Sequence, residues 1–434
     1  MGKWTEKDIL SLSPDESSTK NAKNLLGFSK WKNLGYNKRS LWGECQGSGS
    51  KPYLTQIDLQ ETSFKCSCPS RKFPCKHGLA LFLLYANNEK NFSEKNPPSW
   101  VSDWIDKKES REKKKSEPSK KSVDEKAQAK RVEQREAKVK TGINEVELWI
   151  KDLIRNGLNS LPEKQNEFWR SISQKTIDAQ APGLSNFLTK LGNINYASDS
   201  WQTELLESLC KIHLIVQGFK NIETLPKGLQ SDIQTLIGWT LKQEDLKAES
   251  GLSDEWLVLG RQQEIEQDLT VQYNWLFGEN SKQYALVLNF AYKNQPIDLN
   301  LVPGTKLKAE LVYFPSNYPM RAVLKEVKET LEFRKVSGFQ NWQEMLEHYS
   351  DALSHYPWIT KLPILVQNLT PYLDVENRIL VDQKKNFVKI ANSFTAHWTV
   401  VACSGGKPLD FFLVYEGGFV TPLGVWIDDL YMVL

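Results

Sequence analysis

Residues 64–78 read Phe-Lys-Cys-Ser-Cys-Pro-Ser-Arg-Lys-Phe-Pro-Cys-Lys-His-Gly, and they hold three of the six cysteines and one of the five histidines of this 434-residue chain. The potential ligands are spaced Cys-x-Cys, six residues, then Cys-x-His. Zinc prefers thiolate sulfur and imidazole nitrogen, and four protein ligands leave no position for water. The spacing therefore predicts a closed, structural site for one zinc ion, with the ligands Cys66, Cys68, Cys75 and His77.

The residues around these ligands indicate how the chain brings them together. Cys66 and Cys68 are two apart in an expected strand, so both side chains leave the same face. Residues 79–85 are apolar and predict a buried helix, whose positive N-terminal end favours thiolates at Cys75 and nearby. A disulfide between Cys66 and Cys68 would close a strained ring, and no secretory signal is evident. Zinc is therefore favoured over a disulfide or free thiols.

This pattern, with a hairpin before it and an apolar helix after it, resembles the SWIM zinc finger, a ββα module, across residues 40–90. More broadly, the chain is similar to bacterial SWIM-containing proteins, and residues 178–184 and 313–321 are further points of likeness. The resemblance implies a helical region and then a β-rich region after the finger. It also implies a protein partner, because such bacterial proteins resemble accessory components of MoxR-type AAA ATPase and von Willebrand A systems.

Composition and periodicity predict an α+β multidomain protein. Hydrophobic residues make up 40% of the chain and charged residues 25%, and the 15 tryptophans imply substantial cores. We expect a small ββα zinc finger domain, a central α-helical bundle and a C-terminal β-rich α+β domain. The expected divisions are 1–105 for the finger domain, 106–140 for a basic, partly helical linker, 141–250 for the helical domain and 251–434 for the β-rich domain.

Within the first two divisions, residues 1–36 are expected to be partly helical, and residues 40–46 and 53–59 to form a hairpin. Cys45 on that hairpin is expected to be a small buried hydrophobe. Residues 106–121 are almost free of apolar side chains and predict disorder, and the segment from Ser122 to Lys140 predicts a charged helix. The finger is expected to pack through four aromatic side chains, those of Trp42, Tyr53, Phe64 and Phe82.

The later divisions contain weaker candidate sites. Cys210 and His213 share a helix face, where core burial is the simpler expectation than half a metal site. Residues 342–356 predict a helix whose Glu344, His348, Asp351 and His355 stripe is most simply its solvent-exposed face, although such groups could bind metal or do acid–base work. Hairpins are expected at 271–292 and 396–415. In an extended 396–403 segment, His397 and Cys403 would lie too far apart to act as a nucleophile and base.

Charge is distributed unevenly along the chain. Residues 1–105 carry 15 Lys and Arg against 10 Asp and Glu, residues 106–140 carry 14 against 8, and the remainder carries 27 against 35. A basic front is typical of nucleic-acid binding, and an acidic body would repel the same phosphates. Two classes of function therefore remain: protein interaction through the finger, or DNA or RNA binding through the linker lysines and the basic residues of the finger, Lys65, Arg71, Lys72 and Lys76.

Other motifs are missing from the sequence. It contains no glycine-rich phosphate loop, His-Glu-x-x-His pair, nucleophile elbow or kinase signature, so we expect a non-enzymatic protein. It has no run of eighteen apolar residues and no recognisable signal peptide, so we expect no membrane partner and a cytoplasmic location.

Overall fold

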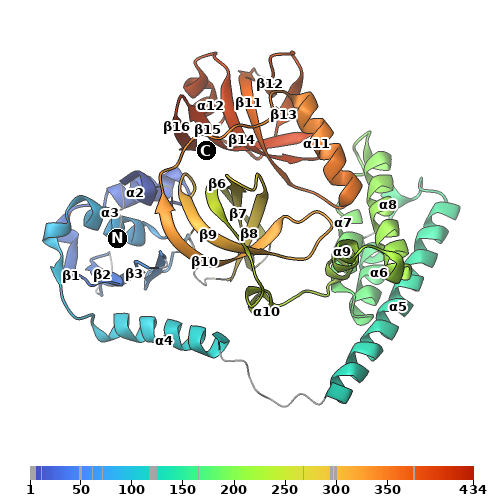
Figure 1. The fold of residues 1–434 in the computed structure, drawn as a ribbon, viewed down its shortest axis with the longest axis horizontal. Coiled ribbons are helices and arrows are strands. Elements are labelled where there is room, and N and C mark those ends of the chain that lie inside the picture. Colours follow the sequence, from blue (N-terminus) through green and yellow to red (C-terminus); the bar gives the residue numbers. More distant parts are fainter. Residues whose placement is uncertain are drawn as a thin grey trace.

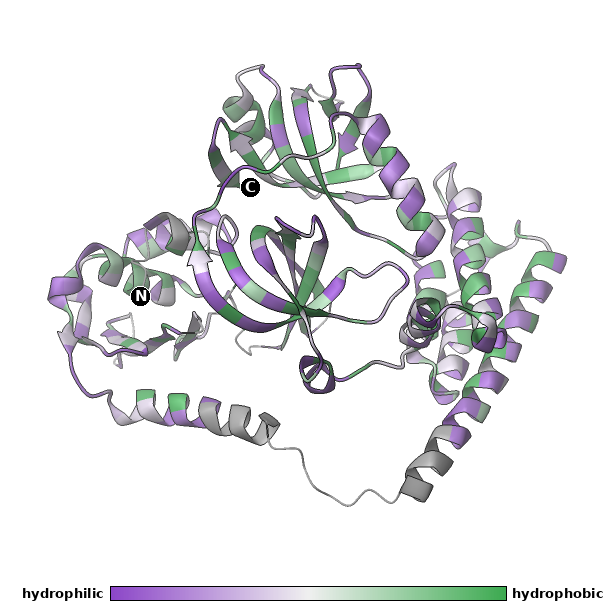
Figure 2. Cartoon of the chain, in the orientation of Figure 1, coloured by the Kyte–Doolittle hydropathy of each residue, from purple (hydrophilic) through white to green (hydrophobic). Residues whose placement is uncertain are grey.

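The computed structural model describes residues 6–434 apart from 11, 48–50, 61, 71, 117–124, 165, 267, 294–296, 298–300 and 375–376. Four parts follow one another along the chain: an N-terminal sheet with its helices, a helical region and two β-barrels (Figure 1). The predicted α+β class is confirmed. In the barrels, hydrophobic and hydrophilic residues alternate along the strands (Figure 2), as expected for sheets with one face toward a core.

The N-terminal sheet has the order β4-β3-β2-β1-β5, antiparallel except for the β1–β5 pair. Leu41, Ile57 and Phe64 project from the face that α3 covers, and their core also includes Leu81 and Phe82 of that helix. The elements are α1 (Glu6–Leu10), α2 (Glu16–Lys23), η1 (Phe28–Lys30), β1 (Trp31–Tyr36), β2 (Ser40–Cys45), β3 (Tyr53–Asp58), β4 (Ser63–Cys66), α3 (Lys76–Asn87), η2 (Glu89–Asn91) and β5 (Ser93–Glu94).

Helix α4 (Ser99–Ser116) lies against the opposite face of this sheet. Lys108 Nζ of α4 donates to Asp58 Oδ2 at 3.1 Å and to Ser63 Oγ at 2.7 Å. Two predictions are wrong here. Residues 106–116 are helical rather than disordered, because these contacts and the buried Val101 hold α4 on the sheet and its Lys, Glu and Arg residues are good helix formers. Trp42 is fully buried, but strand alternation turns it away from α3.

The helical region begins with the charged helix that the sequence predicts, and residues 117–124 before it lie outside the described part of the chain. Its core is formed by residues such as Val146, Ile150, Trp169, Leu188 and Leu205. No helix among the described residues is long and apolar enough to cross a membrane. The elements are α5 (Glu125–Arg155), η3 (Leu161–Glu163), α6 (Asn166–Asp178), α7 (Pro182–Leu191), α8 (Trp201–Lys220), η4 (Ile222–Thr224), α9 (Lys227–Ile237) and α10 (Gln243–Lys247).

The first barrel is closed in the order β10-β8-β7-β6-β9, with antiparallel pairs except for β8–β10. The predicted hairpin at 271–292 is confirmed as β7 and β8. Trp256, Leu276 and Leu311 are fully buried in its interior. The strands are β6 (Leu252–Glu266), β7 (Leu269–Gly278), β8 (Tyr284–Tyr292), β9 (Lys306–Tyr313) and β10 (Arg321–Leu331).

The second barrel repeats this connectivity. Its sheet runs β13-β12-β11-β14-β15-β16 and closes through a parallel β13–β15 pair, as β8 and β10 close the first. In both, the long first strand is bulged, between Val258 and Gly260 and between Val366 and Leu369. This is the architecture of five-stranded Greek-key barrels of the OB type. The elements are α11 (Trp342–His355), β11 (Leu362–Leu373), β12 (Arg378–Val381), β13 (Phe387–Ile390), α12 (His397–Ser404), β14 (Leu409–Glu416), β15 (Phe419–Ile427) and β16 (Leu430–Val433).

The predicted hairpin at 396–415 is wrong, because residues 397–404 form helix α12 and not a strand. The β-branched residues of this segment favour a strand, but the chain uses it to connect β13 to β14. Val400 and His397 are buried there, and Arg378 Nη1 lies 3.0 Å from His397 Nε2. Tertiary packing has therefore overridden local propensity.

The two barrels pack face to face through an apolar interface. Trp275, Phe277 and Leu286 from the first barrel meet Phe412 and Leu423 from the second. A Cβ on Gly260 would lie 2.8 Å from Leu423 Cβ and 2.9 Å from Phe412 Cε1, so the bulge in β6 leaves room for the second barrel only with glycine there. Lys361 also bridges them, 2.7 Å from Glu264 of β6 and 3.0 Å from Glu416 of β14.

Of the two further segments of likeness, residues 178–184 lie inside the helical region and residues 313–321 lie between the helical region and the barrels. In residues 178–184, Gly183 packs so closely on α9 that an added Cβ would lie 2.2 Å from the Leu236 carbonyl oxygen. In residues 313–321, the Asn317 backbone N–H donates to Asp232 Oδ2 of α9 at 2.8 Å, and its side-chain amide donates to the His355 carbonyl oxygen. These segments hold the helical region together and connect it to the barrels.

Candidate metal centre

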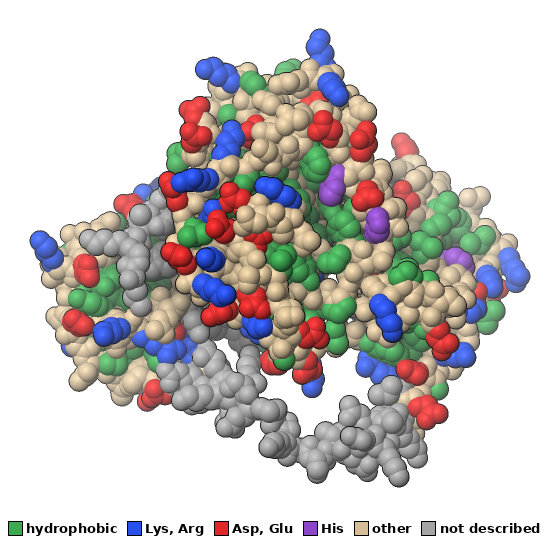
Figure 3. All heavy atoms as spheres, viewed as in Figure 1, with side chains coloured by type: hydrophobic (Ala, Val, Ile, Leu, Met, Phe, Trp, Pro, Cys, Tyr) green, Lys and Arg blue, Asp and Glu red, His purple; other side chains and the backbone are tan. Residues whose placement is uncertain are grey.

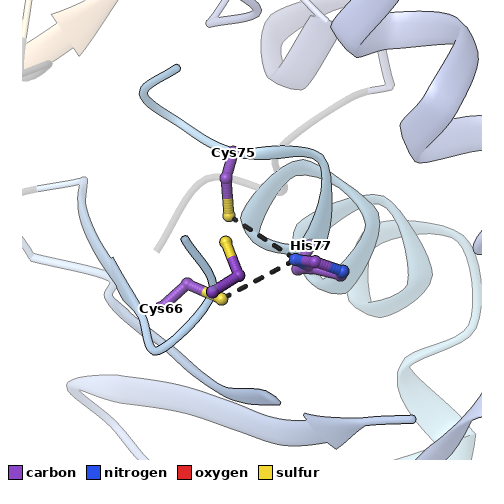
Figure 4. Close-up of side chains that lie close together, drawn as sticks. Cys66, Cys75 and His77 are labelled. Carbon is purple, nitrogen blue, oxygen red and sulfur yellow. Dashed lines mark hydrogen bonds between the residues drawn. The ribbon is translucent and has the colours of Figure 1, made fainter. Parts of the chain in front are cut away.

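The four predicted ligands come from the end of one strand and the start of one helix. Cys66 is the last residue of β4, and Cys68 follows in the turn, just beyond the strand on which we expected both. Cys75 is the N-cap residue of α3, and His77 lies in that helix's first turn. The side chains of Cys66, Cys75 and His77 converge between the strand and the helix (Figure 4). Residues nine to eleven apart thus meet because the intervening turn folds back.

The spacing of the donor atoms fits one tetrahedral zinc ion. The four ligand atoms all lie within 4.8 Å of one another. The ring nitrogen that faces the sulfurs is His77 Nδ1, which lies 3.8 Å from Cys66 Sγ and 4.0 Å from Cys75 Sγ. Zinc bound tetrahedrally to sulfur at about 2.3 Å and to nitrogen at about 2.0 Å separates neighbouring donors by about 3.5 to 3.8 Å. The donor set and its geometry therefore suit a closed Cys3His zinc site.

The closeness of the three sulfurs shifts their pKa values and favours a bound cation. The sulfurs of Cys66 and Cys68, together with burial, raise the pKa of the Cys75 thiol. Cys68 raises the pKa of Cys66 to about 11, and the hydrogen bonds that Cys68 accepts from Cys66 and Cys75 lower its own pKa. Three sulfurs so close together cannot all be thiolates unless positive charge compensates them. A bound zinc ion would supply that charge and hold the strand, turn and helix together.

Neighbouring side chains hold the ligands in place. Thr55 of β3 pairs with Cys66 across the ladder, and its Oγ1 lies 3.3 Å from Cys66 Sγ. The Tyr53 ring lies 4.8 Å from the His77 ring. An added Cβ on Gly78 would lie 2.9 Å from the Phe64 ring, so the glycine allows α3 to pack closely on β4. No motif in the sequence singles out Thr55 for this role, although its position opposite Cys66 follows from the hairpin register.

The turn between the ligand pairs is tied to the N-terminal helices. Lys72 Nζ lies 2.7 Å from Asp15 Oδ2. Asp15 is also the N-cap of α2, where its Oδ1 accepts from the Ser18 backbone N–H at 2.6 Å. The hydrogen bond from Lys72 lowers the pKa of Asp15. One carboxylate thus caps α2 and anchors the turn beside the metal site.

The basic residues predicted to contact nucleic acid do not all lie on one side of the finger. Lys65, Lys72 and Lys76 are exposed, and Arg71 lies outside the described residues. Lys65 alternates with Phe64 and Cys66 along β4, so its side chain leaves the face of the sheet opposite α3. Lys76 belongs to α3 itself, and Lys72 is paired with Asp15. The role of these residues remains a prediction.

The weaker candidates do not form metal sites. Among the described residues, the only group of three or more ligand side chains placed to hold a metal is the Cys3His cluster. Cys210 and His213 are exposed on α8, so the expectation that they are buried is wrong: they occupy the face that does not pack on the bundle. Cys45 is buried as expected, and burial raises its pKa to about 11.

The stripe on α11 is divided among separate local contacts. Glu344 accepts hydrogen bonds from the Gln340 backbone and the Asn341 side chain at the start of the helix. His348 Nε2 lies 3.3 Å from the Tyr318 hydroxyl, and burial lowers the pKa of this histidine. His355 and Asp351 form an exposed pair at 3.7 Å. The stripe therefore begins as solvent-exposed surface and is partly covered at His348.

Comparison with protein families identifies two parts of the chain. Residues 53–86 match the model of the SWIM zinc finger, and residues 134–237 match that of the SWIM-associated four-helix bundle domain. The first match contains all four ligands, and the second covers helices α6 to α9 and the C-terminal part of α5. Comparisons with curated proteins and with solved structures found no match. The chain is therefore a SWIM zinc finger domain-containing protein, with its associated helical bundle following the finger.

Proposed function

We propose that this protein is non-enzymatic and that its zinc-held finger binds a protein partner within a larger assembly. The observation that carries the proposal is the closed Cys3His donor set, in which every ligand position of the metal is taken by the protein. Such a site organises a surface rather than activating water or substrate. Zinc binding would hold the β3–β4 hairpin, the turn and α3 in one fixed arrangement.

The packing of the finger onto the first barrel supports a role in assembly. Ala291, Ile297 and Val302, which follow or end β8 in the barrel, belong to the same core as Phe64 and Leu79 of the finger. The finger is thus fixed on a β-rich body and not carried on a free linker. A partner that binds the finger would therefore be positioned with respect to the barrels, as a scaffold requires.

Charge also favours a protein partner over nucleic acid at the finger. Phosphate binding needs several cations that can face one backbone, and each contributes to a steep salt dependence. In this finger Lys65 and Lys76 leave different faces, and Lys72 already pairs with Asp15. Figure 3 shows acidic and basic side chains interspersed over the visible face of the molecule, with no continuous basic surface. An AAA ATPase system is the class of partner that the family resemblance favours.

The test is capture of partners from the native host by the full chain, with and without the metal site. Wild type should retain a reproducible protein partner after nuclease treatment, and Cys68→Ser should lose it together with the zinc. Cys210→Ser is the matched control, because Cys210 is exposed on α8 and lies outside the cluster. Retention of the same partner by zinc-free Cys68→Ser would contradict the proposal. Direct titration of the purified partner against the three proteins would then give the loss of affinity.

DNA or RNA binding by the finger is the alternative, favoured by the exposure of Lys65, Lys72 and Lys76. It requires that nuclease treatment abolish the capture. It also requires that a Lys72→Gln, Lys76→Gln double variant bind a labelled DNA or RNA oligomer more weakly and with a smaller salt dependence than wild type.

A further inference from the structure

The two barrels share a topology but differ in what covers the outer face of their second and third strands. In the first barrel, Trp275 and Phe277 of β7 and Leu286 of β8 are buried against the second barrel. In the second barrel, the equivalent strands β12 and β13 and the adjoining end of β11 expose large side chains. Tyr372 is 53% exposed and Phe387 is 58% exposed. The first barrel therefore uses part of this face for internal packing, whereas Phe290 and Tyr292 at the far end of β8 are 48% and 51% exposed. The second barrel leaves the corresponding face open.

Strand register shows that the open face is continuous. Tyr372 pairs with Ile379, which pairs with Lys389. Thr370 pairs with Val381, which pairs with Phe387. Leu380 and Ile390, at the alternate positions, are buried in the barrel core, so both rows point outward. The two rows together make the outer face: Thr370, Tyr372, Ile379, Val381, Phe387 and Lys389.

The two aromatic rings of this face are far enough apart to contact two different bases. Tyr372 and Phe387 lie two strands apart and two residues apart along the strands. With about 4.8 Å between strands and about 3.4 Å per residue, their Cα atoms are about 12 Å apart. Ile379 and Val381 form a half-buried apolar floor between them. Each ring is therefore free to stack on a separate planar group that spans this floor.

The charge of the β12–β13 hairpin is positive where it meets solvent. Lys384, Lys385 and Lys389 are exposed. The single acidic residue of the hairpin, Asp382, is 5% exposed, and its carboxylate accepts from the backbone N–H groups of Trp342 and Asn386. Arg378 is turned toward His397 at 3.0 Å. The lysines thus stand beside the aromatic face without a solvent-exposed acidic neighbour among the residues of their own hairpin.

A groove of about 770 Å³ extends the face from Phe387 to helix α11. Lys385 and Phe387 line one side of it, and Leu346, which is 43% exposed, lines the other. Glu347 also stands on the α11 side. An anionic backbone would therefore run along the hairpin, where the lysines lie, and away from α11.

We propose that this open face, defined by Tyr372, Phe387 and Lys389, binds single-stranded nucleic acid. Exposed aromatic rings stack on unpaired bases of any sequence, and nearby lysines contact the phosphates. The corresponding strands of OB-type barrels form ligand surfaces for oligonucleotides. In this molecule the assignment rests on the exposed rings and lysines of the second barrel, since the equivalent face of the first barrel is partly covered by the second barrel and its Lys293 pairs with Asp268. The site is independent of the function proposed for the finger.

The test is titration of the full, zinc-loaded chain with a fluorescein-labelled dT oligomer of about 15 nucleotides, followed by anisotropy at low and moderate salt. Tyr372→Ala and Phe387→Ala should each weaken binding by about 5- to 150-fold, the range for loss of one stacked base. Lys389→Gln should weaken binding and lower the slope of log affinity against log salt by about 0.7. All three side chains are exposed, so circular dichroism and zinc content should match wild type.

Two exposed residues of the same barrel serve as matched controls. Trp398 on α12 is 74% exposed but lies off the β11–β12–β13 face, and Lys407 is exposed before β14. Trp398→Ala and Lys407→Gln should bind the oligomer as wild type does. Equal losses in these controls would show nonspecific surface binding and would overturn the proposal.

Three further results would also overturn it. One is the absence of salt-sensitive oligomer binding by wild type. Another is binding that survives Tyr372→Ala and Phe387→Ala but is lost in the Lys72→Gln, Lys76→Gln double variant, which would place the nucleic acid on the finger. The third is a Phe387→Ala variant that binds the oligomer normally but loses a protein partner in host capture, which would make the face a protein-docking surface.

Discussion

The N-terminal sheet and the two barrels are stabilised by different means. The strands of the N-terminal sheet are at most six residues long, and its Cys3His cluster joins β4 to α3. In the barrels the strands reach 15 residues, and Trp256, Trp275 and Trp426 are fully buried. Small modules with limited cores commonly depend on a metal, whereas larger apolar cores do not. The comparison implies that loss of zinc should be a local event, confined to the part that contains the ligands.

The largest expected effect is that of removing the metal. Chelation, or the variant Cys75→Ser, should eliminate the bound zinc and unfold the SWIM finger, residues 53–86, because structural zinc in small modules contributes about 10 kcal/mol or more. Hydrogen exchange should become fast in β3, β4 and α3 and stay slow in the buried strands of both barrels. Unchanged exchange in the finger would contradict the claim that zinc stabilises it. Equal loss of protection in the finger and the barrels would contradict the claim that the effect is local.

A substitution in the interface between the barrels should destabilise the barrels and leave the zinc site intact. Phe412 is fully buried between the two barrels, so Phe412→Ala should lower the free energy of unfolding of the barrels by about 3 to 5 kcal/mol. Zinc content should remain at one per chain, because the ligands lie beside the core of Phe64 and Leu79, to which Phe412 does not belong. Thermal unfolding with metal analysis would measure both. The control Trp398→Ala, at a 74% exposed position, should change stability by less than about 0.5 kcal/mol.

A smaller effect is expected at the bulge of β6. An added Cβ at Gly260 would meet both Leu423 and Phe412 at less than 3.0 Å, so Gly260→Ala should overpack the interface and cost about 1 to 3 kcal/mol. Chemical denaturation would measure this loss. Gly405→Ala is the comparison variant. At Gly405 a Cβ would meet nothing within 4 Å, but φ is +53°, so this variant introduces backbone strain without crowding. A neutral Gly260→Ala would show that the barrels do not pack as closely as described.

The smallest effect concerns the ion pair between the finger turn and α2. Lys72→Gln should cost at most about 1 kcal/mol, because both partners are largely exposed. Lys72 lowers the pKa of folded Asp15, so the contribution of the pair is present above the unfolded value of 3.8 and is lost as the pH falls through the lower folded value. Denaturation of wild type and Lys72→Gln should give a stability difference at pH 7 that begins to decline below about pH 4 and disappears only below the lowered pKa of folded Asp15. A difference that grew in acid would contradict this assignment.

Local patterns in the sequence predicted much of this structure. The four ligands were predictable because zinc chemistry requires particular side chains at short spacing, and the structure brings all four together. The β7–β8 hairpin followed from alternating apolar residues around a polar turn. Helix α11 followed from its helical periodicity, although the partial burial of His348 depends on Tyr318, 30 residues earlier.

Features that depend on distant contacts were not predictable in the same way. His397–Ser404 carries strand-forming residues, but it is a helix where the chain connects β13 to β14. Trp42 was expected in the finger core, yet it faces α4, which the charge of residues 106–116 had concealed. The repeated barrel topology depends on parallel closure between β8 and β10 and between β13 and β15, and no local pattern specifies which strands close a barrel.

The most direct test of the central claim is X-ray absorption spectroscopy at the zinc edge, with metal quantification, on the purified full chain. We expect one zinc per chain, with three sulfur neighbours at about 2.3 Å and one nitrogen neighbour at about 2.0 Å. In Cys68→Ser this signal should be lost, and in Cys210→Ser it should be unchanged. Protein free of zinc, or a zinc shell of nitrogen and oxygen without three sulfurs, would contradict the assignment of Cys66, Cys68, Cys75 and His77 as its ligands.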